Sequence, residues 1–557
     1  MKKALRRLFI TLCWVIGIFI LMLEGLGFYA WKVSDVQPPK LADTSAFALQ
    51  AAHPEGSLYT IGDNWERRNK WGLYELYVSG APFERGVKNG KLTAPLITAQ
   101  EAAFTDQIKH MIPSKGYLRF LKYVVGLMNR GLPAAVPEEY KEEIYGVSHA
   151  AQDSFAWVGN KYTRILNYHA AHDIGHALQN MMLVGCTSFG AWGNASADGS
   201  MVIGRNFDFW VGDQFAENKI VAFYRPDKGH NFMFVTWGGF TGVVSGMNDK
   251  GLTITINAAK STIPFGAQTP VSLVAREMLQ YAGNIDEALK IAHRRKMFVS
   301  ESFLIVSAAD RKAVVVEKTP DSLAVYESNS NSIECTNHYQ SAFFQNDKLN
   351  QKQRARSAST YRMSRLTELM QAAGPMSPQK AADILRDRRG LGGADIGEGN
   401  EKAVNQLLAH HSIIFMPDSL RVWVSTSPWQ LGTYVCYDLR KIFAMHGLQH
   451  DVEIADSSLN IAPDAFLGTP AFADFMRFRT AKMAVMNKQQ IDTAALTRNN
   501  PSLYDAYRLA GDYSASKGWW DAAVAYYNVA LTKEIATEDE RDAIIQKIKR
   551  IQKKRPH

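Results

Sequence analysis

Cysteine is scarce in this sequence, and the scarcity limits how the fold can be crosslinked. The 557 residues include four cysteines, and one of them, Cys13, lies in an apolar run near the N-terminus. Exported proteins often pair their cysteines, but the other three, Cys186, Cys335 and Cys436, are an odd number. Complete pairing outside the apolar run is therefore excluded, and a thiol that is left over can be a reactive one.

Charge is limited too. Charged residues make up 21% of the chain and hydrophobic residues 46%, as in a folded globular protein rather than a disordered one. The formal net charge is +9, but much of the excess lies at the two ends, where such residues are typical of solvated helix ends. These residues are Lys2, Lys3, Arg6, Arg7, Lys547, Lys549, Arg550, Lys553, Lys554 and Arg555. No aromatic residues are interleaved with them as in nucleic-acid-binding surfaces, so we predict no nucleic-acid partner.

One apolar run, residues 8–31, is long enough to cross a bilayer, which requires about twenty residues. It is interrupted only by Thr11 and Glu24, and four basic residues precede it. We therefore predict a transmembrane signal anchor over residues 1–31, with everything from Lys32 onward on the outer, periplasmic or extracytoplasmic, side. The alternative is a secreted protein whose signal peptide is removed near residues 27–30.

The rest of the chain predicts an α+β protein followed by a helical tail. Residues 32–71, with Pro38 and Pro39, are interpreted as a tether. Strands are expected at 73–78, 185–192, 201–207, 220–224, 232–237, 252–256, 302–307, 313–317, 323–328, 412–416 and 420–425. Helices are expected at 93–111, 138–151, 271–281, 285–292 and 361–373. Sheet, helices and sheet in this order favour a layered α+β fold over a parallel one.

The tail, residues 465–557, resembles one tetratricopeptide (TPR) unit. Residues 503–516 and 519–532 predict a helix–turn–helix with small and aromatic residues at packing positions, namely Leu509, Gly511, Tyr513, Gly518, Ala522 and Ala530. One unit cannot form a solenoid, because each repeat buries its face against neighbours. We interpret the tail as a helical cap on the main domain, with recruitment of a partner as the alternative.

The chemistry is concentrated at Gly185-Cys186-Thr187-Ser188 and at Gly204-Arg-Asn-Phe-Asp208. A cysteine that follows a glycine at the start of a strand suits a nucleophile created by scission of the backbone. Breaking the Gly185–Cys186 bond would leave Cys186 with a thiol and a free α-amino group. That amine has a reference pKa near ~8, so it can act as the general base for the thiol.

Ordered motifs around this block resemble a known family. They are Gly80-Ala-Pro-Phe-Glu-Arg-Gly86, Gly246-Met-Asn-Asp-Lys-Gly-Leu252, Thr336-Asn-His-Tyr339, Ser359-Thr-Tyr-Arg362, His411-Ser-Ile-Ile-Phe-Met-Pro417 and Trp423-Val-Ser425. The chain is similar to the autoproteolytic acyltransferase/hydrolase family (penicillin acyl-transferase type, peptidase C45-like) of the N-terminal-nucleophile (Ntn) hydrolases. This family is related to choloylglycine hydrolases and acid ceramidase-like amidases. The resemblance implies a four-layer αββα sandwich, with a light chain over 72–185 and a catalytic domain over 186–440.

The resemblance and the chemistry together assign roles to six residues. Cys186 attacks the amide carbonyl and forms a thioester, and Arg205 lowers the pKa of its thiol. Asp208 orients the new α-amino group, and Arg362 steadies Asp208 or the nucleophile. Asn257 and Asn337 donate to the tetrahedral oxyanion. Asn248 is the alternative to Asn257, and plain structural roles are the alternative for Arg205, Asp208, Asn337 and Arg362.

The predicted reaction is hydrolysis of a linear N-acyl amide, or transfer of the acyl group to an amine by the same thioester chemistry. Aromatic residues near the site in sequence favour an apolar acyl group: Phe189, Trp192, Phe209, Trp210, Trp237 and Phe240. No cofactor is expected.

Two other functions stay open. His169, His172 and His176 share one helical face beside Asp173, a spacing that could bind zinc in a metal-dependent hydrolase. No distant fourth ligand is evident, so we predict no metal. The second alternative is an inactive, membrane-tethered interaction protein.

Overall fold

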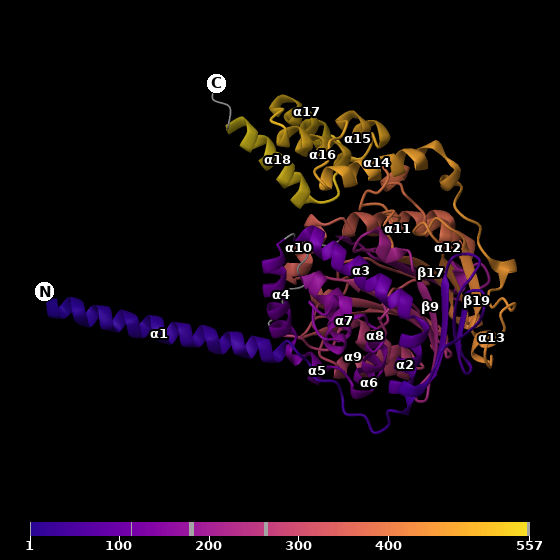
Figure 1. Cartoon of the computed structure of the whole chain (residues 1–557). Helices are drawn as coiled ribbons and strands as arrows, with labels where there is room; N and C mark the ends of the chain where they lie inside the picture. The colour runs from indigo at the N-terminus through magenta and orange to yellow at the C-terminus, as the bar shows by residue number, and fades with distance from the viewer. Residues whose placement is uncertain (1, 113, 178–182, 261–265, 554–557) are drawn as a thin grey trace.

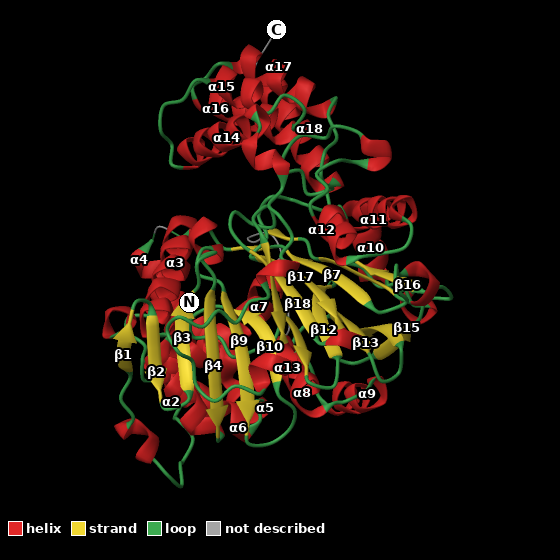
Figure 2. Ribbon diagram, turned by 90° about the vertical axis from the view of Figure 1, so that its right-hand side faces the viewer, coloured by secondary structure: helices red, strands yellow, loops and turns green. Residues whose placement is uncertain are grey.

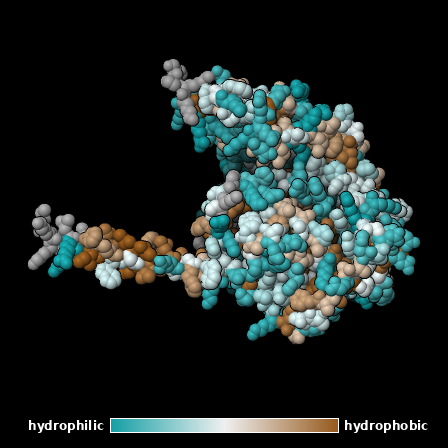
Figure 3. Space-filling model, in the orientation of Figure 1, coloured by the Kyte–Doolittle hydropathy of each residue, from teal (hydrophilic) through white to brown (hydrophobic). Residues whose placement is uncertain are grey.

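The computed structural model describes residues 2–112, 114–177, 183–260 and 266–553. Helix α1 (Lys2–Val33) projects from the body of the molecule (Figure 1). Its segment Phe9–Val33, 25 residues, is long and apolar enough to cross a membrane, a test that a signal sequence also passes. Figure 3 shows the hydrophobic side chains gathered along this helix, whereas the body is mostly hydrophilic on the same face.

Two β-sheets form the centre of the body. The larger sheet has eleven strands in the order β1-β2-β3-β4-β9-β10-β11-β12-β13-β14-β15, and the smaller has six in the order β16-β6-β7-β17-β18-β19. The larger comprises β1 (Ala52–Glu55), β2 (Leu58–Ile61), β3 (Asn64–Arg68), β4 (Tyr74–Gly80), β9 (Ile220–Pro226), β10 (Phe232–Thr236), β11 (Ser245–Asn248), β12 (Leu252–Ala258), β13 (Glu301–Ser307), β14 (Lys312–Lys318) and β15 (Leu323–Tyr326). The smaller comprises β16 (Ser332–Cys335), β6 (Thr187–Ala191), β7 (Val202–Phe207), β17 (His411–Met416), β18 (Arg421–Ser425) and β19 (Tyr434–Asp438). Neighbouring strands are antiparallel, except that β4 pairs with β9 in parallel.

The sheets pack face to face and helices cover their outer faces (Figure 2). Phe223 and Val306 of the larger sheet share one buried cluster with Ile413 and Val424 of the smaller sheet. Another cluster joins the outer face of the larger sheet to α2 (Pro82–Leu92), α6 (Glu138–Ser148), α7 (Lys161–Ala177), α8 (Val271–Tyr281) and α9 (Ile285–Arg294). A third joins the smaller sheet to α11 (Ser359–Ala373) and α12 (Pro378–Leu385). The body is therefore layered helix–sheet–sheet–helix.

The C-terminal segment is helical and has a core of its own. It comprises α14 (Pro470–Met486), α15 (Thr493–Asn499), α16 (Tyr504–Ser516), α17 (Trp520–Leu531) and α18 (Glu538–Lys553). The turn between α16 and α17 contains Gly518, whose φ of +78° favours glycine. A Cβ at Gly511 would lie 2.5 Å from the Tyr527 ring, so the absence of a side chain there allows α16 and α17 to approach closely.

The region predicted as a tether, residues 32–71, is ordered into strands from residue 52 onward. Strands β1, β2 and β3 extend the larger sheet beyond β4. Gly56 and Gly62, both with positive φ, occur in the turns between them, and Leu58 and Trp65 are buried. These two apolar anchors stabilise the strands against the body, so the tether prediction is corrected for this part.

Candidate active site

Cys186 lies between β5 (Leu183–Val184) and β6, and it is fully buried. Pairing of β6 with β7 places Ser188, two residues after Cys186, opposite Arg205. As a result, Arg205 Nη2 is 3.5 Å from Cys186 Sγ. The antiparallel hairpin therefore brings the predicted nucleophile and the predicted cation together.

Burial outweighs the neighbouring cation in setting the state of the thiol. Burial raises the pKa of Cys186 to about 11, although Arg205 and Arg362 act to lower it. Arg205 is itself held by hydrogen bonds to Val244 O (2.9 Å), Ser245 Oγ and Ile256 O. Arg205 thus lowers the pKa of the thiol as expected, but the net shift is upward, and a base must remove the proton.

Gly185, the residue before Cys186, is hydrogen-bonded through both its N–H and its C=O. Gly185 N–H donates to Asp208 O (3.0 Å), and Gly185 O accepts a hydrogen bond from Gln406 Nε2 (2.7 Å). Gln406 Nε2 also lies 3.3 Å from Asp208 Oδ2. Burial raises the pKa of Asp208 to about 7, so this carboxyl can exchange a proton near neutrality. Gln406 was not among the predicted residues, because a single glutamine in a loop carries no signal in one sequence.

Arg362, on α11, contacts Cys186 and the residue that follows it. Its Nε donates to Thr187 Oγ1 (2.9 Å), and its Nη2 lies 3.4 Å from Cys186 O and also donates to Asn337 Oδ1. Its remaining hydrogen bond goes to Glu401 O (3.0 Å). No hydrogen bond to Asp208 is among those described for it, so Arg362 orients the Cys186 backbone and Asn337.

The two predicted oxyanion donors lie near the nucleophile, and each already donates to a carbonyl. Asn257 Nδ2 donates to Cys335 O (3.1 Å), and its Oδ1 accepts from Ser188 Oγ (2.6 Å). Asn337 Nδ2 donates to Ala258 O (2.9 Å). Each amide retains a second hydrogen for a substrate.

Asn248, the alternative to Asn257, has a structural role. Its Nδ2 donates to Leu279 O (2.9 Å) and Ala282 O (2.8 Å) near the end of α8. Its Oδ1 accepts from the backbone of Lys250 and Leu252 in the turn before β12. The four bonds use the whole amide, so Asn248 fixes the turn.

The histidine face proposed for zinc is not supported where the structure describes it. His169 Nε2 accepts from Thr241 N (2.9 Å), and its Nδ1 donates to Ile165 O (2.8 Å). Burial lowers the pKa of His169 to about 4. The side chains of His172 and His176 lie outside the described residues. In the part of the chain that is described, no three His, Cys, Asp or Glu side chains are grouped to hold a metal.

Two small cavities flank this region. One, of about 60 Å³, borders Gly185 and the C-terminal segment, and its lining includes Gly185, Asn337, Arg362, Glu401, Gln406 and Thr537. The other, of about 40 Å³, is mostly aromatic, with Phe104, Tyr168, Phe209, Phe215, Trp237 and Phe240 in its wall. The ring centroid of Trp237 lies 4.2 Å from that of Phe240 and 6.4 Å from that of Phe207. The Arg205 guanidinium lies 4.5 Å from the Phe207 ring centroid. The aromatic cluster therefore extends to Arg205, which contacts Cys186.

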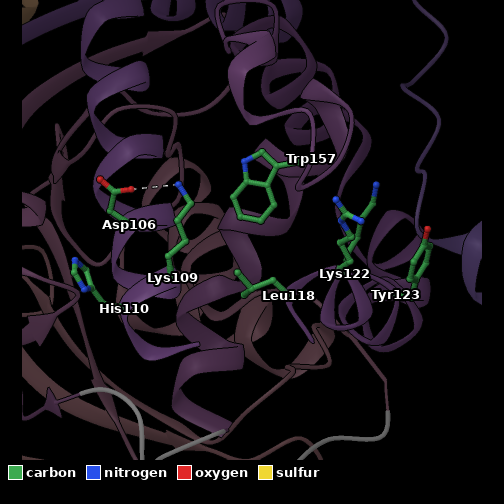
Figure 4. Close-up of a pocket in the computed structure, with 8 residues that line it drawn as sticks. Asp106, Lys109, His110, Leu118, Lys122, Tyr123 and Trp157 are labelled. Atoms are coloured by element: carbon green, nitrogen blue, oxygen red, sulfur yellow. Dashed lines mark hydrogen bonds and ion pairs between the residues drawn. The ribbon is translucent and has the colours of Figure 1, made fainter. Parts of the chain in front are cut away.

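A larger cavity, of about 1000 Å³, lies elsewhere. It is bounded by α3 (Ala94–Met111), α4 (Lys115–Met128) and Trp157, and its lining includes Asp106, Lys109 and Lys122 (Figure 4). Lys109 forms an ion pair with Asp106 (3.4 Å). None of the six predicted catalytic residues lines it.

Comparisons with known proteins cover part of the chain. Residues 195–424 match the family described as "Acyl-coenzyme A:6-aminopenicillanic acid acyl-transferase". An uncharacterized protein of Archaeoglobus fulgidus is 28% identical over 293 residues, 49% of this chain and 46% of that protein. Protein dcd1B of Dictyostelium discoideum is 22% identical over 296 residues, 50% of this chain and 55% of that protein. The chain spans about half the length of the curated relatives it matches.

Two solved structures are also similar. One is a Caenorhabditis elegans N-acylethanolamine-hydrolyzing acid amidase ortholog, with 18% identity, 42% of this chain and 93% of that chain covered, and a TM-score of 0.30. The other is a mutant conjugated bile acid hydrolase from Clostridium perfringens, with 12% identity, 46% and 93% covered, and a TM-score of 0.33.

The family match lies within the region whose ordered motifs carried the resemblance, and it begins shortly after Cys186. Over residues 195–424 the chain is therefore similar to the acyl-coenzyme A:6-aminopenicillanic acid acyl-transferase family, which agrees with the resemblance that the motifs predicted.

Proposed function

We propose that this protein cuts its own backbone between Gly185 and Cys186 and then uses Cys186 to cleave, or to transfer the acyl group of, a linear N-acyl amide. The observation that carries the proposal is the arrangement of the Gly185–Cys186 peptide. Its carbonyl oxygen, Gly185 O, accepts from Gln406 Nε2, the N–H of the same glycine donates to Asp208 O, and Arg205 contacts the adjacent thiol. A peptide held this way beside a thiol is oriented for attack.

Asp208 and the later α-amino group would act as bases at successive stages. Before scission the thiol is protonated, because burial raises the pKa of Cys186 to about 11. Asp208, with a pKa raised to about 7, can accept that proton. After scission the α-amine of Cys186 lies on the nucleophile itself and can take over, since its reference pKa is near ~8.

In turnover, the substrate carbonyl would take the place of the Gly185 carbonyl. Cys186 Sγ would add to the carbonyl carbon and expel the amine, giving a thioester that water or another amine resolves. The second amide hydrogens of Asn257 and Asn337 would contribute to binding the oxyanion. The aromatic cluster around Trp237 and Phe240 supports an apolar acyl group.

Helix α1 would anchor the enzyme, with the body on the outer side of the membrane. The segment that ends at Gly185 would stay bound after scission, because β1 to β4 belong to the larger sheet. The C-terminal helices would act as a TPR-like cap. Their turn at Thr537 lines the cavity beside Gly185, which supports this placement.

Intact mass spectrometry of the purified full-length protein, beside Cys186→Ala and Cys335→Ala variants, tests the proposal. We expect two fragments from the parent, the second beginning at Cys186, and a single uncut chain from Cys186→Ala. Cys335→Ala, which alters another buried thiol, should cut like the parent. A parent that stays a single chain after prolonged incubation would contradict the proposal.

A further inference from the structure

Gln406 lies on a buried loop just before β17, and its neighbours fix its position. Asn405 Oδ1 accepts from Leu407 N (2.9 Å), and Asn405 N donates to Asp387 O (2.8 Å). Four residues after Gln406, His410 N donates to Phe207 O (2.9 Å). Leu407 has a φ of +53°, an uncommon conformation for a residue with a side chain. Such conformations persist where the surroundings enforce them, often at functional sites.

The Gln406 amide faces the two groups that scission would use. Its Nε2 lies 2.7 Å from Gly185 O and 3.3 Å from Asp208 Oδ2, so one nitrogen donates to the scissile carbonyl and to the carboxyl. A Cβ at Gly185 would lie 2.4 Å from Gln406 Nε2 and 2.8 Å from Oε1. A side chain at residue 185 would therefore displace the glutamine amide.

We propose that Gln406 is a catalytic residue that donates a hydrogen bond to the oxyanion formed on Gly185 during self-cleavage, and later to the oxyanion of the substrate. The inference rests on the proposed function and adds a residue to it. The distance of 2.7 Å from Nε2 to Gly185 O lies within the range of oxyanion donors.

The step conserves atoms and electrons as follows. The Cys186 thiol gives its proton to Asp208, and Sγ forms a bond to the Gly185 carbonyl carbon. The C=O electron pair moves to oxygen, where Gln406 Nε2–H stabilises the charge. The C–N bond then breaks, the Cys186 nitrogen takes the proton from Asp208, and a thioester remains. Water adds to the thioester carbonyl, the C–S bond breaks, and the products are the Gly185 carboxylate, the free thiol and a proton.

The predicted donors Asn257 and Asn337 are placed differently. Their described amide bonds go to Cys335 O and Ala258 O, not to Gly185 O. Among the described residues, Gln406 is the side chain that donates to the scissile carbonyl. Gln406 also contacts Asp208 at the wall of the 60 Å³ cavity, which it shares with Arg362. A substrate carbonyl entering there would meet the same donor.

The experiment measures the first-order rate of cleavage at Gly185 in full-length protein by intact mass. The variants are Gln406→Met, which keeps the length of the side chain without a donor, and the control Gln430→Met. Gln430 is another buried glutamine, whose amide lies 3.5 Å from Leu385 O. We expect Gln406→Met to slow cleavage by about 10²- to 10³-fold, the loss seen when one oxyanion donor is removed. Gln430→Met should cut at close to the parent rate.

A second variant separates donation from simple packing. Gln406→Glu carries a donor only when its carboxyl is protonated, so the ratio of its rate to the parent rate should rise as the pH falls. A merely structural role predicts a ratio that does not change with pH. Folded Gln406→Met that cuts at the parent rate, or a flat ratio for Gln406→Glu, overturns the inference while self-cleavage stands. A parent that does not cut overturns the proposed function itself.

Discussion

Burial keeps the Cys186 thiol protonated. Desolvation is the largest influence on its pKa, and Asp208 is close enough to raise it further when charged. A thiol with a pKa of about 11 contributes almost no thiolate at neutral pH. The proposed self-cleavage then depends on how readily a neighbouring group accepts the proton, and Asp208 is the buried carboxyl proposed for this role.

The pH dependence of self-cleavage tests this role of Asp208. Its pKa is raised to about 7, so the carboxyl is neutral below that pH and charged above it. We expect the cleavage rate to fall about tenfold per pH unit below neutrality and to level off above it. Asp208→Asn should cut far more slowly, and its rate should not change with pH near neutrality. Asp198→Asn, at an exposed carboxyl in the turn before β7, should retain the pH profile of the parent. Intact mass over time gives the rates, and a parent profile without a step near pH 7 would sink the assignment.

Asn248 and Asn257 occur close together in sequence but should respond differently to substitution. Asn248→Ala removes four hydrogen bonds at a buried turn, and each unpaired buried group costs about 1–3 kcal/mol. We expect a lower thermal midpoint with the cleavage rate of the folded fraction unchanged. Asn257→Ala frees Ser188 Oγ and Cys335 O next to the nucleophile, so cleavage should slow. Thermal melts beside cleavage rates separate the two, and equal effects on both quantities would refute the distinction.

Sequence patterns predicted which residues lie around Cys186 better than they predicted the protonation of these residues. Cys186, Arg205, Asn337 and Arg362 form the connected contacts that the ordered motifs suggested. The upward pKa shift of Cys186 could not be predicted, because burial depends on the packed sheets and not on neighbours in sequence. Gln406 could not be predicted either, since it reaches Gly185 across 221 positions of sequence.

At the scale of elements, strong periodicity gave reliable predictions and mixed patterns did not. The helix expected at 271–281 coincides with α8, one side of which packs on the larger sheet. Helix α7 was expected only through the shared helical face of His169, His172 and His176. Its bounds were not predicted, because its polar residues, among them Arg164 and His169, are buried and satisfied by tertiary partners. Strands β1 to β3 were missed because they are short and lie at the edge of the sheet.

The crossing of α2 and α6 depends on glycine. A Cβ at Gly86 would lie 2.0 Å from Glu143 O, and one at Gly146 would lie 2.6 Å from Phe83 O. Gly86→Ala must therefore separate the helices and disturb the buried ion pair between Arg85 and Glu143. We expect the free energy of unfolding to fall by about 1–3 kcal/mol, the usual cost of overpacking.

The matched control is Gly116→Ala, in the exposed part of α4. No atom lies within 4 Å of a Cβ there, so alanine should be neutral or stabilise the helix by up to about 1 kcal/mol. Chemical denaturation of both variants measures the difference. Equal stability of Gly86→Ala and the parent would show that the two helices can separate without loss.

On the scale of the whole molecule, the proposed scission at Gly185 would divide the sequence but not the fold. Strand β4, before the cut, pairs in parallel with β9, after it, from Tyr74 opposite Ile220 to Gly80 opposite Pro226. Glu143 before the cut accepts from Arg276 after it at 2.8 Å, with both side chains fully buried. Breaking a buried pair of this kind costs about 3–5 kcal/mol, in addition to the shared core.

These contacts predict where the two fragments are found. Helix α1 belongs to the first fragment. The fragment that begins at Cys186 has no apolar helix of this length among its described residues. If α1 anchors the enzyme, the second fragment should still stay on the membrane through its contacts with the first. After washing membranes in neutral buffer, we expect both fragments in the pellet. Urea should release the second fragment and leave the first, because unfolding removes the shared sheet but not the apolar helix. Release of both fragments by a neutral wash would instead indicate that α1 acts as a signal sequence. Loss of the second fragment alone would show that the sheet does not survive the cut.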